Sequence, residues 1–395
     1  MRKPWAVFPL LLVAAVSVST SLQAQALLTT PGDGDRVFVI TDPLMATSVG
    51  DADAVTGLPV DAQPHAATWI DDRYAMVADF QHSRVHLIDT QTRSVTQTIN
   101  TLFDRYNGTG SLTTSPDGSV VLGFGQRNTQ FNDKIVVLRA PFDGPVEYLT
   151  PAAGLDALAS YRTQGIVFDT SGRAFVQGVG AISVIDPPYT AANFKMRHGS
   201  PPAATESGVL LLSADQQTLL STNGRDVIEI YRAPFAAEQV PDASFSMTWS
   251  SGGGNVGSLL FLPGTDRLLV ARGGRPELAV VTGLLAGAPV IEELVMPAAL
   301  DNVCGDAGDT ACPGFEHAAL DPEGQFVLLT GNSVDAQGRA PMARLLLDGD
   351  DIAIETLPVD SSDPALRGRG SGAVVLAPAA SVVPDDDIFA DGYED

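Results

Sequence analysis

Residues 65–89 read HAATWIDDRYAMVADFQHSRVHLID. Three short apolar runs are separated by an acidic turn and by a polar turn. Runs of this length that are bounded by turn residues are typical of antiparallel strands joined by tight hairpins. The stretch therefore predicts consecutive strands of one small sheet, and the question is whether the pattern repeats.

The hairpin pattern returns along the chain. Each copy has a strand of about five residues, a tight turn and a second strand, and a third and a weaker fourth apolar run usually follow. The copies begin at His65, Gly110, Gln164, Gly208, Gly257 and His317. Four strands per unit at a period of roughly 40–55 residues indicate a β-propeller, whose blades stack around an axis because no blade buries both faces alone.

The two ends of the chain supply a further blade. Residues 27–49 resemble the second, third and fourth strands of a blade without its first, and Gly370–Pro378 resemble the missing first strand. Joining them closes the ring and removes exposed sheet edges. We therefore predict an all-β fold, a seven-bladed β-propeller of four-stranded antiparallel blades closed by pairing the N- and C-terminal strands. A six-bladed ring with ragged ends and a pair of β-sandwiches are the alternatives.

Several of these residues resemble a known family. Pro64-His65-Ala66, the stretch MVADFQHSRVHLIDTQTRSV and the turn Ser115–Gly118 resemble the YVTN-type seven-bladed propellers, exported relatives of WD40-like and quinoprotein-like propellers. The resemblance covers nearly all of the mature chain. The third to fifth copies depart from it, and the Tyr-Val-Thr-Asn tetrad appears only as variants such as Met76–Asp79. It implies the fold and a binding or scaffolding role, although some similar rings are lactone hydrolases or carry redox cofactors.

The N-terminus has the pattern of a secretory signal peptide. Arg2 and Lys3 precede an apolar stretch that runs into Ala24-Gln25-Ala26, a small-residue cleavage pattern. We predict cleavage after Ala24 or Ala26 and a periplasmic or secreted protein; an N-terminal anchor helix is the alternative. The acidic end, PDDDIFADGYED, resembles a short terminal tag or is a solvated tail. The expected domains are a signal peptide at 1–26, a β-propeller at 27–380 and an acidic tail at 381–395.

The formal net charge of −24 limits the partners. A field of that sign repels nucleic acid and anionic lipid, so we expect neither as a partner, and no membrane insertion after signal cleavage. We expect a monomer that binds an unknown protein, a glycan or a small anionic ligand. Cys304 and Cys312 are the two cysteines, and in an exported chain they predict a disulfide rather than a metal pair.

The topology of a propeller nominates one mouth of the ring as the binding face. Loops that enter the first strands, and loops between second and third strands, gather there. They carry a large share of the chain's few cations. Their arginines could bind carboxylate or phosphate groups through bidentate hydrogen bonds, or could simply pair with neighbouring acids. The binding-face candidates are His65, Arg127, Arg162, Arg225, Arg272, Arg275, His317, Arg339 and Arg369.

The sequence contains no complete catalytic constellation. A nucleophile-elbow motif, a haem-attachment motif and a P-loop are all missing. We predict a non-enzymatic binding or scaffolding module with no catalytic residue, metal ligand or cofactor; His65 and His317 then serve to pack neighbouring blades. The alternative is a lactonase-like hydrolase with a metal-assisted site in the funnel, in which these histidines act with Glu316 or Asp226. A non-covalent redox cofactor is a third possibility.

Overall fold

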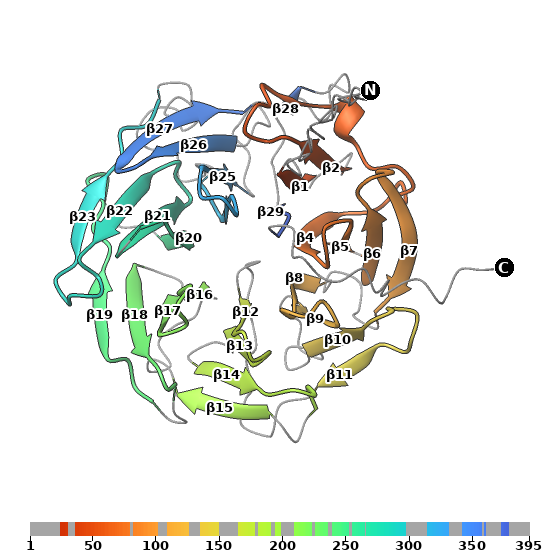
Figure 1. The fold of residues 1–395 in the computed structure, drawn as a ribbon, viewed down its shortest axis with the longest axis horizontal. Helices are drawn as coiled ribbons and strands as arrows, with labels where there is room; N and C mark the ends of the chain where they lie inside the picture. The colour runs from red at the N-terminus through yellow and green to blue at the C-terminus, as the bar shows by residue number, and fades with distance from the viewer. Residues whose placement is uncertain are drawn as a thin grey trace, which may run out of the picture.

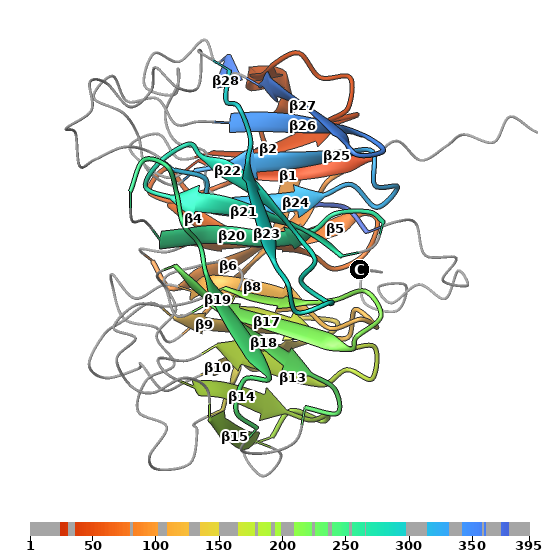
Figure 2. The same ribbon diagram turned by 90° about the vertical axis from the view of Figure 1, so that its left-hand side faces the viewer.

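The computed structural model shows a ring of seven blades around a central axis (Figure 1). Seen from the side, the ring is a disc in which inner strands such as β20 and β24 run roughly along the axis, whereas outer strands such as β19 and β23 are steeply inclined to it (Figure 2). Among the described residues, no helix is long and apolar enough to cross a membrane. The predicted all-β, seven-bladed propeller is confirmed. The structure describes residues 24–30, 36–79, 82–101, 109–125, 135–149, 165–177, 181–190, 194–198, 209–222, 226–235, 239–252, 255–264, 266–297, 314–331, 342–357, 359–360 and 373–378.

Blades 1 to 3 are four-stranded antiparallel sheets with the strands in chain order. Blade 1 contains β4 (Pro64–Trp69), β5 (Tyr74–Asp79), β6 (Arg84–Asp89) and β7 (Ser94–Asn100). Blade 2 contains β8 (Thr109–Thr114), β9 (Val120–Gly125), β10 (Ile135–Arg139) and β11 (Glu147–Leu149). Blade 3 contains β12 (Ile166–Phe168), β13 (Ala174–Gln177), β14 (Ala181–Ile185) and β15 (Phe194–His198).

Blades 4 to 6 repeat this order, with the first strand at the axis and the fourth at the rim (Figure 1). Blade 4 contains β16 (Leu210–Leu212), β17 (Thr218–Thr222), β18 (Val227–Arg232) and β19 (Ala243–Ser246). Blade 5 contains β20 (Asn255–Phe261), β21 (Arg267–Gly273), β22 (Leu278–Thr282) and β23 (Val290–Glu293). Blade 6 contains β24 (His317–Leu320), β25 (Phe326–Thr330), β26 (Met342–Asp348) and β27 (Asp351–Thr356).

Blade 7 is built from both ends of the chain. Its strands lie in the order β29 (Val374–Leu376), β1 (Gln25–Thr30) and β2 (Arg36–Thr41), all antiparallel. Within this sheet Leu27 pairs with Val375 on one side and with Val39 on the other. The predicted closure by pairing the terminal strands is confirmed.

The outer edge of blade 7 differs from that of the other blades. A single bridge between Phe38 and Ala54 stands where they have a fourth strand. Close by in the chain, β3 (Val49–Gly50) pairs in parallel with β28 (Val359–Asp360), and the 3₁₀ helix η1 (Asp51–Asp53) follows β3. The chain that leaves blade 6 therefore joins the segment that follows β2 before it returns to the axis as β29.

The hydrophobic core is divided among the blade interfaces. The described residues form seven apolar clusters, one between each pair of neighbouring blades. Between blades 1 and 2, for example, Met76 and Ala78 pack with Val121 and Val136, all fully buried. Each blade contributes to two clusters, because its second and third strands are apolar on both faces. This packing explains the continuous apolar runs in the sequence.

Tight turns connect the first and second strands. In blade 2 the Gly118 amide donates to the Ser115 carbonyl oxygen, and Gly118 has a φ of 72°. Gly324 of blade 6 repeats the turn with a φ of 73°, and its amide donates to Asp321. A left-handed conformation at the last turn position favours glycine, which explains the SPDG and DPEG sequences.

Buried aromatic residues fasten three of the blades to the blades before them. Phe142, Tyr189 and Phe235 follow the third strands of blades 2, 3 and 4, each after a cis proline peptide and with a positive φ. All three are almost completely buried. Phe235 packs edge-to-face on Phe175 of blade 3, with the ring centroids 5.4 Å apart. Each aromatic ring therefore fills the interface with the preceding blade.

Arginines join other blades through backbone carbonyl oxygens. Arg139 of blade 2 donates to Pro188 of blade 3 over 2.8 Å. Arg344 of blade 6 reaches three carbonyl oxygens of blade 7, those of Pro43, Leu44 and Ala46, at 2.7–2.9 Å. A guanidinium group can make several such bonds because it presents five donors in a rigid plane.

Candidate functional site

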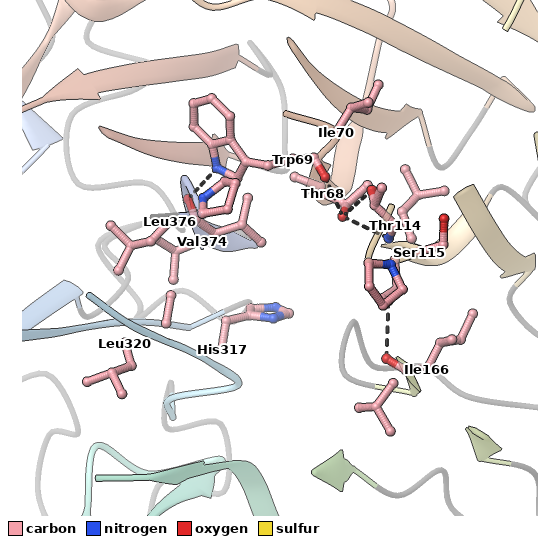
Figure 3. Close-up of a pocket in the computed structure, with 18 of the residues that line it drawn as sticks. Thr68, Trp69, Ile70, Thr114, Ser115, Ile166, His317, Leu320, Val374 and Leu376 are labelled. Carbon is pink, nitrogen blue, oxygen red and sulfur yellow. Dashed lines mark hydrogen bonds between the residues drawn. The ribbon is translucent and has the colours of Figure 1, made fainter. Parts of the chain in front are cut away.

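The axis of the ring contains a cavity of about 830 Å³ (Figure 3). Its wall is formed by the first strands of all seven blades, which are β4, β8, β12, β16, β20, β24 and β29. It extends to the turns that follow β4 and β8. A volume of this size lies within the range of roughly 300–1,000 Å³ that is usual for small-molecule sites. We call this cavity the central channel.

Most of the channel wall is apolar. The first residue of β12, β16 and β29 is buried in a blade interface, and the next two residues are only partly buried. Val167, Leu211 and Val375 are in this position and line the channel. Leu260 of β20 and Leu320 of β24 add to the same surface. Because these side chains keep some access to solvent, an apolar ligand that covered them would remove their apolar surface from water.

Apart from His317 of blade 6, the polar side chains of the described wall residues belong to blades 1 and 2. The hydroxyl oxygens of Thr68 on β4 and Thr114 on β8 lie 3.0 Å apart, and the Thr114 amide donates to Thr68 over 3.2 Å (Figure 3). The Thr113 hydroxyl donates to the Ile166 carbonyl oxygen of blade 3 over 3.2 Å. These bonds fix the hydroxyl groups in one orientation. The channel therefore has one polar side and one apolar side.

Two carboxylates lie where the channel meets the turns after β4 and β8. Oδ1 of Asp71 accepts hydrogen bonds from the amides of Arg73 and Tyr74, at 2.8 and 2.6 Å. Burial raises the pKa of Asp71 above its usual value. Asp117 is more exposed, and although burial opposes the shift, hydrogen bonds from Ser115 and Ser119 lower the pKa of Asp117. Hydrogen bonds therefore favour the charged form of Asp117, whereas burial disfavours the charged form of Asp71.

Two of the predicted histidines lie close together at the channel. His317 begins β24, lines the cavity and points into it (Figure 3). Burial and the neighbouring His317 lower the pKa of His65 to about 4, while Glu316 opposes the shift. At neutral pH His65 is therefore an uncharged imidazole. The fold brings together His65, His317 and Glu316, which the sequence analysis could only place on separate loops and strand ends.

Arg272 is a structural residue as well as a predicted binding residue. It is 3% exposed. Its guanidinium donates to the Ser251 hydroxyl over 2.5 Å, to the Glu277 carboxylate and to the Gly252 carbonyl oxygen over 3.1 Å. It also lies 5.5 Å from the ring centre of Trp249. These contacts link the loop before β20 to the loop after β21. Arg272 therefore pairs with a neighbouring acid, Glu277, as the alternative to ligand binding predicted.

The remaining predicted residues are in different surroundings. Arg275 is partly exposed near Glu277, whose amide donates to its carbonyl oxygen over 2.8 Å. Asp226, the alternative acid, accepts the Met247 amide at its carbonyl oxygen and does not line the channel. The other predicted binding and disulfide residues lie outside the described part of the chain, and they are Arg127, Arg162, Arg225, Arg339, Arg369, Cys304 and Cys312.

A second histidine pair forms part of a buried polar cluster in blade 1. His86 is fully buried, and its Nδ1 lies 3.0 Å from the Thr98 hydroxyl. His82 lies between the carboxylates of Asp61 and Asp79, at 3.2 and 3.3 Å. Within the described ranges, no three His, Cys, Asp or Glu side chains are arranged to hold a metal ion.

The sequence of the chain matches no family model and no curated protein. Solved structures do resemble it. The periplasmic gluconolactonase of Pseudomonas aeruginosa has a TM-score of 0.60 at 15% identity, over 90% of this chain and 99% of that chain. A protein from Lactobacillus plantarum has a TM-score of 0.63 at 13% identity, over 90% and 99%. A putative 6-phosphogluconolactonase from Bacteroides fragilis has a TM-score of 0.59 at 11% identity, over 91% and 99%.

At these identities the likeness shows the propeller fold alone. The match extends over nearly the full length of each neighbour, so the whole ring is shared. The narrower resemblance to YVTN-type propellers stays a prediction.

Proposed function

We propose that this chain is a binding protein that holds a small, largely apolar ligand in its central channel. The observation that supports this best is the cavity of about 830 Å³ whose wall all seven blades share. Burying apolar surface stabilises a complex by roughly 25 cal/mol per Å². A closed ring also holds its wall in place, so little conformational entropy is lost when the ligand enters. The proposal places the ligand deeper than the loops at the mouth.

A neutral fluorescent probe, N-phenyl-1-naphthylamine, tests this proposal. We expect saturable binding with about one probe per chain. Binding is measured from the rise in probe emission and from the quenching of the fluorescence of Trp69, which lines the channel. Ala319→Trp places a large ring on the channel wall and should weaken binding by at least roughly tenfold. Val60→Trp is the matched control, because Val60 is fully exposed elsewhere. Equal affinity in the two variants contradicts the proposal.

Lactone hydrolysis is the second candidate function. It is favoured by the convergence of His65, His317 and Glu316, and two structural neighbours are described as a gluconolactonase and a putative 6-phosphogluconolactonase. It ranks second because a base with a pKa of about 4 gives little driving force for activating water at neutral pH. The described residues also offer no metal ligand set for the metal-assisted version.

Proton release from glucono-δ-lactone and its 6-phosphate separates the two candidates. A binding protein should not hydrolyse either lactone faster than buffer does. A wild-type rate that disappears in His317→Gln, while Asp226→Asn keeps it, would place hydrolysis first. Asp226 is a suitable control because it does not line the channel.

We also propose that the chain is exported and that Cys304 pairs with Cys312. The N-terminal signal pattern and the oxidising environment of exported proteins support both statements. Thiol labelling of the denatured, unreduced protein should then find no free thiol. The expected monomer is tested separately by size-exclusion chromatography. Two labelled thiols per chain would contradict the disulfide.

A further inference from the structure

We infer that the ligand of the central channel is a cationic amphiphile, that is, an apolar body with one protonated amine. The inference rests on the proposed function, because it assumes that the channel is the ligand site. It adds the chemical class of the ligand, which follows from the distribution of charge and polarity on the wall.

The charged side chains on the channel wall are acidic. Asp71 and Asp117 line it, and none of the described wall residues is a lysine or an arginine. His317 lies at the other end of the wall. Its neighbour His65 is uncharged at neutral pH, because its pKa is lowered to about 4. The whole chain carries a formal charge of −24, which adds to the negative potential. These two carboxylates would repel an anionic ligand, whereas they would attract a cation.

Asp71 has the geometry of a recognition group. Its Oδ1 accepts the two turn amides, and no described residue donates to Oδ2. The nearest arginine in sequence, Arg73, instead donates to Asp89, with an Nη2–Oδ2 distance of 2.7 Å. The turn therefore fixes the carboxylate through one oxygen, and because the other oxygen has no donor among the described residues, a ligand could supply one.

Partial burial of Asp71 makes a cationic donor more favourable than a neutral one. Burial raises the pKa of Asp71, which means that its charged form has lost hydration. A bound ammonium group would restore a charged partner to it. Charge-assisted hydrogen bonds of this kind are about twice as strong as neutral ones.

The rest of the wall fits the body of such a ligand. Val167, Leu211 and Leu260 line the opposite side of the channel, where the described wall residues of blades 3, 4 and 5 are all apolar. The hydroxyl groups of Thr68 and Thr114 are already bonded to each other. One carboxylate beside an extended apolar surface matches a molecule with one amine and an otherwise apolar structure.

Three probes that share one ring system test the inference. They are 2-naphthylmethylamine, 2-naphthylmethanol and 2-naphthoate, and each is measured by displacement of N-phenyl-1-naphthylamine at pH 7. We expect the amine to bind roughly tenfold more tightly than the alcohol, and the carboxylate to bind most weakly. Lowering the pH through the pKa of Asp71 should remove the advantage of the amine, because its ammonium group stays charged while Asp71 is neutralised.

Two isosteric variants identify the group responsible. Asp71→Asn keeps an oxygen for the turn amides, and it should abolish the preference for the amine without weakening the alcohol. Asp72→Asn is the control, since Asp72 is exposed and does not line the channel. Thermal unfolding of both variants establishes that they fold. Equal loss of preference in both variants, or no preference in the wild-type protein, overturns the inference.

Failure of the inference can be distinguished from failure of the proposed function. If amine and alcohol bind equally and Ala319→Trp weakens both, the channel is the ligand site and its ligand is not selected by charge. If none of the three probes displaces the reporter and Ala319→Trp has no effect, the channel is not the site, and both statements fall.

Discussion

The indole Nε1 of Trp69 donates a hydrogen bond to the carbonyl oxygen of Val375 over 3.1 Å. It links the first strand of blade 1 to the C-terminal strand that completes blade 7. That strand makes only three residue pairs with β1. The bond from Trp69 therefore adds a second attachment for the short closing strand, from the neighbouring blade.

Trp69→Phe should lower the free energy of unfolding by about 1–3 kcal/mol, because it removes this bond and some buried surface. Trp249→Phe is the matched control. The Nε1 of Trp249 is buried without a partner among the described residues, so this change removes packing but no hydrogen bond. Urea denaturation of both variants measures the difference. If Trp249→Phe costs as much as Trp69→Phe, the closing bond contributes nothing to stability.

Arg344→Met should destabilise the junction between blades 6 and 7. The change removes the donor that three carbonyl oxygens of blade 7 share, and we expect a loss of about 2–3 kcal/mol. Arg36→Met removes an arginine whose guanidinium lies 3.5 Å from Asp51 with both side chains over one third exposed, so the loss should be below about 0.5 kcal/mol. Similar unfolding midpoints for the two variants would show that the bonds from Arg344 to blade 7 do not stabilise the junction between blades 6 and 7.

The stability of the protein should fall between about pH 6.5 and pH 4 through His65. Its pKa is about 4 in the folded protein and about 6.5 when unfolded, so within this window only the unfolded chain takes up the proton. The destabilisation due to His65 is absent above pH 6.5 and complete below pH 4, where it lowers the free energy of unfolding by about 1–3 kcal/mol.

His65→Gln, which stays neutral, isolates this effect from the titration of other groups. The free energy of unfolding of the variant should decline less than that of the wild-type protein between pH 7 and pH 4. Parallel curves for the two proteins would show that His65 titrates normally in the folded state.

The mature N-terminus should be Gln25, not Leu27. Ala26 is fully buried in β1, where it pairs with Ile40 and with Leu376. The Gln25 carbonyl oxygen accepts the amide of Ala377. Cleavage after Ala26 would remove these contacts from blade 7, whereas cleavage after Ala24 keeps them. Intact-mass measurement of the exported protein distinguishes the two, and a chain that begins at Leu27 refutes the expectation.

The sequence predicted the hairpins and the closure because local chemistry determines them. The acidic turn between Trp69 and Tyr74 and the Pro- and Gly-containing turns of blades 2 and 6 bound their strand pairs, and the incomplete blade at each end has only one complementary partner. The sequence also carried a signal that we did not use. The repeated stretches RAPF and DPPY mark the buried aromatic residues after the third strands, as at Phe142, Tyr189 and Phe235.

The candidate site was harder to predict, for physical reasons. Continuous apolar runs such as those of β12 and β16 do not reveal which side chains face a neighbouring blade and which face the channel. Arg272 is on a loop, as expected, but its surroundings depend on Ser251 and Glu277, which are brought together only by the fold. The role of Asp71 depends on where the first turn lies relative to the axis. Pattern alone places it in an ordinary tight turn.

The double attachment of the C-terminal region also determines when the molecule can become complete. β1 is synthesised long before the strand that covers its inner edge, β29, because more than 340 residues separate Thr30 from Val374. At ordinary synthesis rates of about 5–20 residues per second, β1 waits between about 20 and 70 seconds for that partner. A prematurely terminated chain never supplies it and keeps an open sheet edge beside the axis. Ring closure therefore distinguishes chains whose β1 edge is covered by β29 from fragments whose β1 edge is open.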